Sequence, residues 1–258
     1  MLKLISWNIA GRLSKLNQQI DYLNSGEFDI ICLQEVISKT HSLITENLRE
    51  YNTISAVELG RLPKIGKHKY NLLILSKAEL YNNRPSHYIK WSEKYLSGIL
   101  KFDNQELEVT TMHVPPGSSN GIEKIISIEQ FYKNIIHSKN MFKIVCGDWN
   151  TPRNEFKNKE IQTWMRTGRE SKRWDDGERL LLQKLKHFGI YDSYRVLNGY
   201  SKEEFSWYTN RKGLSKGRRY DHIHSSETLD VKKCYYDHTV RENKLSDHSA
   251  IISEFNFR

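Results

Sequence analysis

The sequence predicts an α/β protein with a mixed sheet, because strand-like and helix-like patterns alternate along almost the whole chain. Residues 2–8 alternate apolar and polar side chains, and residues 29–33 and 144–146 are short apolar runs typical of buried strands. Residues 122–138 repeat apolar side chains at helical spacing. Strand-like runs follow in quick succession between residues 70 and 114, which is typical of a meander and makes the sheet mixed.

The composition indicates one basic domain with a sizeable core. At 258 residues the chain is long for one domain, but α/β and double-sheet folds reach this size, so we expect residues 1–258 to form one domain. Lys and Arg number 40 against 31 Asp and Glu, which makes the formal charge +9. Such a protein is suited to bind polyanions, nucleic acid first and anionic membrane second. The alternative is that the charge merely reflects a lysine-rich proteome and indicates no function.

The cysteines and the lack of long apolar segments bear on where the protein acts. Cys32, Cys146 and Cys234 are widely spaced and odd in number, so we expect small core residues in a reducing compartment. No segment approaches the length of a membrane span, and the N-terminus has the pattern of a strand rather than of a signal peptide. We therefore expect a cytoplasmic protein without a membrane partner.

The first two strands predict a site at one edge of a sheet. The strand over 2–8 ends in Asn8, and the strand over 29–33 runs into Glu35. The helix between them carries apolar residues at helical spacing: Leu13, Leu16, Ile20 and Leu23. A βαβ unit with short connections brings both strand ends to the edge where ligands bind. Glu35 is a candidate Mg²⁺ ligand, since hard cations prefer oxygen; a solvated glutamate is the alternative.

The next part of the chain predicts a helix, a basic loop and several strands. We expect a helix over residues 42–50 and a strand over 53–57. Residues 60–69 (GRLPKIGKHK) are predicted to be a surface loop, with contact to a nucleic-acid backbone as the competing interpretation. Further strands are expected over 70–76, 87–91, 97–102 and 106–114.

The last of these strands carries His113 close to its end, before a Pro-Gly-Ser loop. A histidine there is well placed to face a ligand, where the imidazole donates to a phosphate oxygen or protonates a leaving oxygen. A surface histidine without function is the alternative. The helix expected over 122–138 then leads directly into the next strand.

Residues 143–152 (KIVCGDWNTP) place a carboxylate and an amide where a buried strand emerges into a loop. The apolar run ends at Gly147, and Pro152 disfavours continuation of the strand. Asp148 and Asn150 are two residues apart, so in a strand they point to the same face. They suit one phosphate, with Asp148 positioning a nucleophile and Asn150 donating to an oxygen; an ordinary turn is the alternative.

Basic and aromatic residues are interleaved after this motif. Residues 153–179 combine arginines with tryptophans, a mixture that suits phosphates and splayed bases. We interpret them as a substrate-shaping insertion; a surface excursion whose tryptophans pack onto the core is the alternative. A helix is expected over 177–189. The candidate nucleic-acid contacts of the whole chain are Arg166, Arg169, Arg173, Trp174, Trp207 and Arg219.

The C-terminal third adds two acids and a histidine close to predicted strands. A basic loop is expected over 211–217, and Asp221 follows two arginines inside a strand-like run. Asp221 either pairs with an arginine or orients a catalytic histidine. Asp247 and His248 lie directly before the apolar strand at 250–257, where they form either an acid–base pair or a structural pair.

The order of these residues resembles the endonuclease/exonuclease/phosphatase superfamily, which includes exonuclease III, the apurinic endonucleases, pancreatic-type deoxyribonuclease, sphingomyelinases and inositol polyphosphate 5-phosphatases. The matching stretches are SWNIAG, DIICLQE, TMHVP, VCGDWNTP, RRYDHI and SDHSAI. They span almost the whole chain in the family's order, and together they are specific. The resemblance implies a four-layer α/β sandwich, with two mixed β-sheets packed face to face and helices on both outer sides.

The resemblance also implies roles for residues in the matching stretches. Glu35 would bind the catalytic Mg²⁺, for which Mn²⁺ would substitute, with Asn8 and Asp247 close by. Asp148 would orient or deprotonate the attacking water. Asn150 would steady the phosphoryl oxygens.

Two histidines complete the set that the resemblance implies. His248 would contact the scissile phosphate, with Asp221 or Asp247 orienting it. His113 departs from part of the family, because exonuclease III and the apurinic endonucleases look to have Tyr there. Pancreatic-type deoxyribonuclease and the lipid phosphodiesterases are similar to this chain in having His. FSWY at 205–208, followed by a basic loop and RRYD, instead looks like exonuclease III.

We predict a Mg²⁺-dependent nuclease that hydrolyses DNA phosphodiester bonds by in-line attack of an activated water. The first alternative is the same chemistry on RNA, phospholipid head groups or inositol phosphates. The second is a catalytically inactive nucleic-acid-binding module, which the presence of the expected catalytic residues disfavours. An HD-type phosphohydrolase is disfavoured because the pairs near His222, His224 and His238 read Asp–His. Nothing in the sequence indicates a protein partner.

Overall fold

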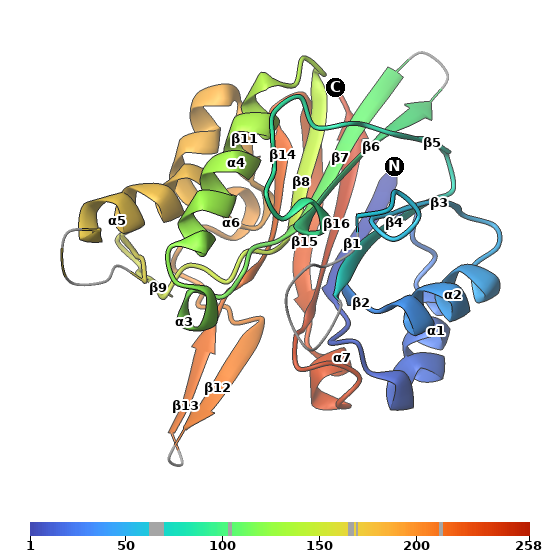
Figure 1. Cartoon of the computed structure of the whole chain (residues 1–258), viewed down its shortest axis with the longest axis horizontal. Coiled ribbons are helices and arrows are strands. Elements are labelled where there is room, and N and C mark those ends of the chain that lie inside the picture. Colours follow the sequence, from blue (N-terminus) through green and yellow to red (C-terminus); the bar gives the residue numbers. More distant parts are fainter. Residues whose placement is uncertain (62–69, 103–104, 165–167, 169, 212–213) are drawn as a thin grey trace.

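Two six-stranded β-sheets form the centre of the protein in a computed structural model, which describes every residue except 62–69, 103–104, 165–167, 169 and 212–213 (Figure 1). The strands of the first sheet are, in spatial order, β15 (Leu229–Asp237), β16 (Ala250–Phe257), β1 (Leu2–Asn8), β2 (Ile30–Val36), β4 (Asn71–Ser76) and β3 (Asn52–Ser55). Those of the second are β11 (Ile190–Asp192), β14 (Asp221–Ser226), β8 (Phe142–Asp148), β7 (Gln105–His113), β6 (Tyr95–Phe102) and β5 (Glu79–Asn82).

Both sheets are mixed, as predicted. β1 pairs with β2 in parallel, and β7 pairs with β8 in parallel, whereas the other neighbours within the two sheets are antiparallel. A parallel pair needs a helical crossover, and α1 (Leu16–Ser25) and α4 (Glu123–His137) supply the two crossovers. The predicted strands over 2–8 and 250–257 are found with the same bounds.

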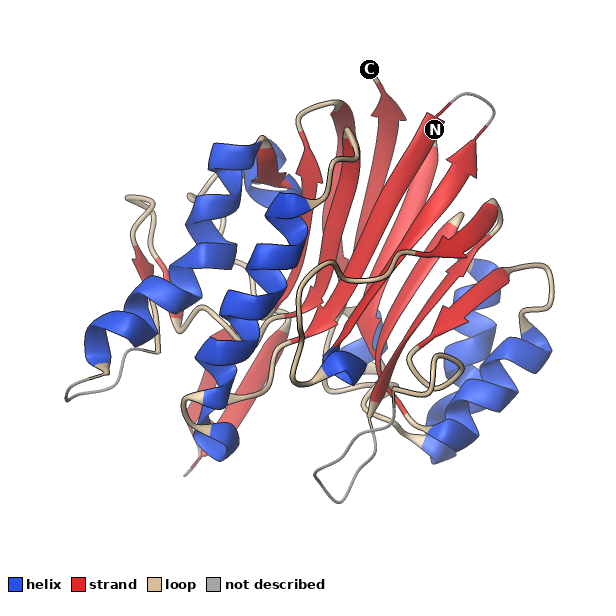
Figure 2. Cartoon of the chain, turned by 45° about the horizontal axis from the view of Figure 1, so that its top comes forward, coloured by secondary structure: helices blue, strands red, loops and turns tan. Residues whose placement is uncertain are grey.

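Helices cover the outer face of each sheet, so the protein has four layers (Figure 2). Apolar residues such as Leu4, Val109 and Ile144 fill the space between the sheets. α1 and α2 (Ser38–Asn47) pack on the first sheet through residues that include Ile20. α4 and α5 (Ser171–Arg179) pack on the second through residues that include Phe131. The predicted four-layer α/β sandwich is confirmed.

Shorter elements connect the layers. They are η1 (Leu13–Lys15), η2 (Ser92–Lys94), α3 (Gly117–Asn120), β9 (Asn154–Glu155), β10 (Ile161–Gln162), η3 (Leu180–Lys184), η4 (Leu185–Phe188), α6 (Ser193–Asn198) and α7 (Thr239–Glu242). β12 (Trp207–Arg211) and β13 (Leu214–Arg218) form a hairpin that projects from the lower edge of the sandwich in Figure 1. The three cysteines are buried and free, as expected of core residues. In the described part of the chain, no helix is long and apolar enough to cross a membrane.

The predicted strand over 87–91 is wrong, because helix α4 takes its backbone hydrogen bonds. Asn134 accepts from the His87 amide at 2.9 Å and donates to the His87 carbonyl at 3.3 Å. Gln130 accepts from the Lys90 amide at 2.9 Å. The edge strand of this sheet is β5, which the sequence analysis did not predict.

Three other boundaries differ from the prediction. Helix α2 begins at Ser38 rather than at residue 42, because the Thr40 hydroxyl accepts from the Ile37 amide and caps an earlier start. The helix predicted over 177–189 begins at Ser171. The described residues of the predicted basic loop over 211–217 belong to the β12–β13 hairpin. The predicted loop over 60–69 lies almost entirely outside the described residues.

Candidate active site

Four strand ends meet at one edge of the sandwich. Asn8 ends β1, His113 ends β7 and Asp148 ends β8. His113 and Asp148 are register partners in the parallel pair of β7 and β8. Asp221 begins β14 and is the antiparallel register partner of Asp148. The pairing of the strands therefore brings four of the predicted site residues together.

His248 lies between two carboxylates. Its Nδ1 is 2.8 Å from Oδ2 of Asp221, and its Nε2 is 3.8 Å from Oδ2 of Asp148. All three residues are buried. Burial lowers the pKa of His248, but the charges of Asp221 and Asp148 outweigh burial and raise that pKa to about 10. The ring is therefore protonated at neutral pH, with Nδ1–H donating to Asp221 and Nε2–H on the side of Asp148.

Asp148 is held in place by two asparagines. Asn8 Nδ2 donates to its Oδ2 at 3.0 Å, and the Asn150 amide donates to its Oδ1 at 2.9 Å. Asn150 Nδ2 also donates to Oδ2 at 3.4 Å. Burial raises the pKa of Asp148 to about 7, although the charge of His248 opposes that shift. A carboxylate with this pKa is suited to accept a proton near neutral pH.

Backbone conformation explains the Gly-Asp-Trp-Asn sequence. Gly147 has φ +128°, and a Cβ atom there would lie 2.0 Å from the Met112 carbonyl oxygen, so only glycine fits against β7. Asn150 has φ +50°, in the left-handed region that asparagine tolerates better than most residues. Asn150 therefore reaches Asp148 through a turn beyond β8, and not through the strand alternation that we predicted.

Glu35 stands at an irregularity in β2. The register between β2 and β4 shifts between Leu33 and Val36, and Glu35 has φ +57°. Its Oε1 lies 3.7 Å from Nε2 of His113, and a fifth of its side chain remains accessible to solvent. Burial raises the pKa of Glu35, and the charge of His248 partly opposes this.

His113 has a partner that the sequence analysis missed. Lys94 places its Nζ 3.1 Å from Nδ1 of His113. Because an ammonium group only donates, Nδ1 accepts, and the proton of the neutral ring lies on Nε2, 3.8 Å from Asp148. Burial, with the charge of Lys94, holds the pKa of His113 well below its usual range. Pairing of Tyr95 with Met112 places Lys94 beside His113, and that register could not be read from sequence.

Asp247 does not orient His248. Its side chain is half exposed, its Oδ2 accepts from Trp207 Nε1 at 3.2 Å, and its Oδ1 lies 3.7 Å from Arg12. Asp221 is therefore the carboxylate that holds His248. Asp247 still lies close enough to Glu35 to raise the pKa of that carboxyl.

The donor atoms at this edge fit a divalent cation. Glu35, His113 and Asp148 lie together, with one nitrogen or oxygen of each within 4.8 Å of the others. Because Nδ1 of His113 accepts from Lys94 and its Nε2 carries the proton, Glu35 and Asp148 are the members of this group that offer free lone pairs to a cation.

Asp247 adds a carboxylate near this group. Asn8 instead turns its Nδ2 toward Asp148, while its Oδ1 accepts from the Ala10 amide at 2.9 Å. Carboxylates outnumber the protonated groups, and oxygen-rich sites with partial exposure suit hard cations. The expectation of a metal-binding site agrees with this donor set.

The predicted nucleic-acid contacts are scattered. Trp174 and Arg219 are buried, so they are not carried forward as contacts: Trp174 packs under α4, and Arg219 pairs with Glu155. Arg173 is on the surface but forms two hydrogen bonds with Glu129. Arg166 and Arg169 lie outside the described residues. Trp207 lies beside the site, with its ring 6.3 Å from the ring of His248.

Comparison with known proteins gives consistent similarities over the whole chain. A model of the endonuclease/exonuclease/phosphatase family matches residues 5–248. A protein from Haemophilus influenzae named exodeoxyribonuclease III is 28% identical over 279 residues, which cover 98% of this chain and 100% of the relative.

Solved structures share the fold. An AP endonuclease from Archaeoglobus fulgidus superposes with a TM-score of 0.74 at 20% identity, covering 99% of this chain and 100% of the other. A single-residue variant of the 3′ phosphatase NExo from Neisseria, bound to a product DNA hairpin, superposes with a TM-score of 0.74 at 16% identity, covering 100% of both chains. At these identities the likeness concerns the fold alone.

Proposed function

Because this chain belongs to the endonuclease/exonuclease/phosphatase family, we propose that it is a Mg²⁺-dependent phosphodiesterase that hydrolyses DNA. Family membership confirms the resemblance found in the sequence and the expected class, a hydrolase of the nuclease type. The proposal adds the metal, the substrate and the mechanism. It also treats residues 1–258 as one catalytic domain.

The arrangement of Asp221, His248 and Asp148 is the observation that carries the proposal. In-line hydrolysis of a phosphodiester needs a positioned water and a positive charge near the phosphoryl oxygens. The protonated His248, anchored by Asp221 at 2.8 Å, supplies a fixed N–H donor and a positive charge. Asp148, with a pKa raised to about 7, faces Nε2 of His248 at 3.8 Å and accepts the proton of the attacking water.

The remaining residues have supporting roles in this proposal. Neutral His113 directs its Nε2–H toward the position of a phosphoryl oxygen, because Lys94 occupies the other ring nitrogen. Asn8 and Asn150 keep Asp148 oriented toward the water. Glu35, with Asn8 and Asp247 close by, would hold Mg²⁺, which when bound offsets the negative charge that grows on the phosphate.

Two observations favour DNA as the substrate. The relative from Haemophilus influenzae carries the name exodeoxyribonuclease III, and the structural neighbour from Neisseria holds a DNA product. The net charge of +9 favours a polyanion in general. Cytoplasmic location and the absence of a membrane partner remain parts of the proposal.

Cleavage of covalently closed plasmid with purified protein and Mg²⁺ tests this function. We expect nicking or linearisation that EDTA abolishes, that excess Mg²⁺ or Mn²⁺ restores, and that Asp148→Ala abolishes. Asp21→Asn, at an exposed position on α1, is the matched control and should cleave normally. An intact plasmid, together with intact end-labelled and abasic DNA, would contradict the proposal and direct attention to RNA and small phosphoesters.

A further inference from the structure

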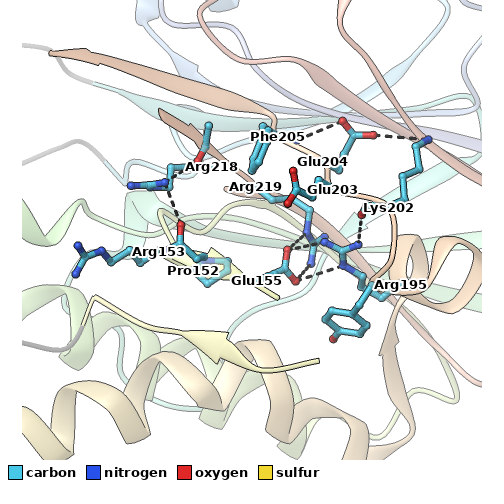
Figure 3. Close-up of a pocket in the computed structure, with 13 residues that line it drawn as sticks. Pro152, Arg153, Glu155, Arg195, Lys202, Glu203, Glu204, Phe205, Arg218 and Arg219 are labelled. Atoms are coloured by element: carbon cyan, nitrogen blue, oxygen red, sulfur yellow. Dashed lines mark hydrogen bonds and ion pairs between the residues drawn. The ribbon is translucent and has the colours of Figure 1, made fainter. Parts of the chain in front are cut away.

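One pocket near the candidate active site is lined by four arginines, two of which pair with a carboxylate and two of which do not (Figure 3). Arg195 and Arg219 pair with the carboxylate of Glu155, which lies between them. Arg153 and Arg218 lie on the other side of the pocket. Among the residues that the structure describes, neither of these two forms an ion pair with a carboxylate. This half of the pocket therefore carries positive charge that no described carboxylate neutralises through an ion pair.

A tryptophan holds the two unneutralised arginines in place. The guanidinium carbon of Arg153 lies 5.6 Å from the centre of the Trp164 ring, and that of Arg218 lies 5.4 Å from it. Both distances are within the range of a cation–π interaction. The Trp164 amide donates at 2.8 Å to Glu178, which is fully buried. The two guanidinium groups thus share one indole, whose backbone is held by Glu178.

Arg218 has a buried N–H group without a hydrogen-bond acceptor among the described residues. Only 8% of the residue is exposed, yet its Nε has no hydrogen-bond partner. One terminal nitrogen donates to Asn154 at 3.2 Å and to the Gly217 carbonyl at 2.7 Å. A buried N–H without an acceptor costs free energy, which an anion would recover.

The chain places this group next to the residues of the candidate active site. Arg153 follows Asn150 by three residues, and Arg218 precedes Asp221 by three. Three residues span at most about 10 Å, which is short compared with an oligonucleotide. Arg218 is also the register partner of Trp207, which donates to Asp247 at 3.2 Å.

We infer that Arg153, Arg218 and Trp164 form a subsite for a backbone phosphate of the nucleic acid near the scissile one, an inference that rests on the proposed function. Two guanidinium groups offer several N–H donors in planar arrays, the geometry that matches phosphate oxygens. The subsite reads no base, since it contacts only the backbone. It fixes where the strand enters the candidate active site, and so contributes to binding more than to the chemical step.

Binding of DNA oligonucleotides to protein carrying Asp148→Asn tests this inference. Single phosphates on each side of the cleavage position are replaced, one at a time, by uncharged methylphosphonates. We expect one such replacement to weaken binding about 10-fold. Arg153→Gln should weaken binding of unmodified DNA about 5- to 10-fold and reduce the slope of log affinity against log salt by about 1. In Arg153→Gln protein, the same methylphosphonate should then cost clearly less than about 10-fold, because one of the two arginine partners of that phosphate is gone.

Two further variants make the test specific. Arg49→Gln removes an exposed arginine that follows helix α2 and should leave both affinity and salt slope as in the parent. Arg218→Lys keeps the charge but loses the planar donors, and we expect a loss smaller than that of Arg153→Gln. Because Arg218 is largely buried, thermal unfolding checks its folding, whereas Arg153 is exposed and carries the test by itself.

The outcomes separate this inference from the proposed function. If Arg153→Gln and every methylphosphonate act additively, or if Arg153→Gln binds like the parent, the subsite is wrong while the nuclease proposal stands. If the Asp148→Asn protein binds DNA but the parent enzyme leaves DNA uncut, the nuclease proposal fails. The combined effects of Arg153→Gln and the methylphosphonates on binding then still test whether the subsite exists. Absence of any DNA binding at low salt would overturn both.

Discussion

The two faces of strand β14 carry two clusters of histidine and aspartate that differ in how their charge is balanced. Successive residues of a strand point to opposite faces. Asp221 points to the side of His248, whereas His222 and His224 point to the side of Asp192, with ring nitrogens 4.0 and 3.7 Å from its Oδ2. The residue types are the same on both faces, but their surroundings are not.

Arginine distinguishes the two clusters. Asp192 accepts from Arg219 at 2.5 Å, and Arg219 also bonds Glu155. Burial alone would raise the pKa of Asp192, but the charge of Arg219, together with the neighbouring His222 and His224, outweighs burial and holds that pKa well below its usual range. On the other face, the described residues include no arginine in an ion pair with Asp148 or Asp221. Acids that arginine neutralises serve the fold, and acids that share one histidine remain available for a substrate or a metal.

The largest expected effect separates the clusters by activity. His248→Asn should lower kcat by about 10³-fold, because it removes a fixed cationic donor beside the scissile phosphate. His224→Asn makes the same change on the other face of β14 and should keep kcat within about threefold. Steady-state kinetics on an oligonucleotide measures both. Equal losses of kcat in the two variants would mean that the two histidine clusters do not differ in their role in catalysis.

The next effect separates the clusters by stability. Arg219→Met should reduce the free energy of unfolding by about 3–5 kcal/mol, since it leaves Glu155 and Asp192 buried without a counter-charge. Arg173→Met breaks the exposed pair with Glu129 and should cost less than about 1 kcal/mol. Urea unfolding at pH 7 compares the two. Similar stabilities would mean that the cluster around Arg219 does not hold this part of the fold.

Asp221→Asn tests how the acid controls His248. The charge of Asp221 helps to raise the pKa of His248 to about 10, so loss of that charge lowers it. We expect about 10²-fold lower kcat/KM at pH 8, and an alkaline limb of the pH profile that moves to lower pH. Profiles between pH 6 and 10 measure both quantities. An unmoved alkaline limb would show that another group controls it.

The smallest expected effect concerns acid stability. Burial lowers the pKa of His224 to about 3, against about 6.5 in an unfolded chain. Between these values the unfolded chain binds a proton that the folded protein does not, so the contribution of His224 to stability declines as pH falls from 6.5 toward 3. The free energy of unfolding that is lost in this way between pH 7 and pH 5 amounts to about 2 kcal/mol.

His224→Leu removes that proton uptake. The variant should lose less stability than the parent when urea unfolding is repeated at pH 7 and pH 5. The opposite holds for His248, whose pKa is raised on folding: its contribution is complete below about pH 6.5 and is lost as pH rises through about 10. Parallel pH dependences of the parent and His224→Leu would contradict the assignment of a neutral buried His224.

Much of the site was predictable because its residues lie at strand ends. Asn8, His113 and Asp148 each close a strand whose apolar pattern is visible in the sequence. Lys94 escaped prediction because it ends the short 3-10 helix η2, and only the pairing of β6 with β7 brings it to His113. Trp174 was predicted to contact nucleic acid, but it is buried. A tryptophan among arginines looks the same in the sequence whether it lies on the buried or on the exposed face of a helix.

Local sequence patterns were enough to predict the alternation of strands and helices, the mixed sheets, and the acids, amides and histidines at the strand ends. Local patterns determine these features, because apolar periodicity and turn residues act within a few positions. The folded structure was needed to see that Asp221 rather than Asp247 holds His248. It was also needed to see that Arg153 and Arg218 share one indole, whereas Arg219 is neutralised. Those outcomes depend on strand register and on distances between residues far apart in the chain, which no local pattern encodes.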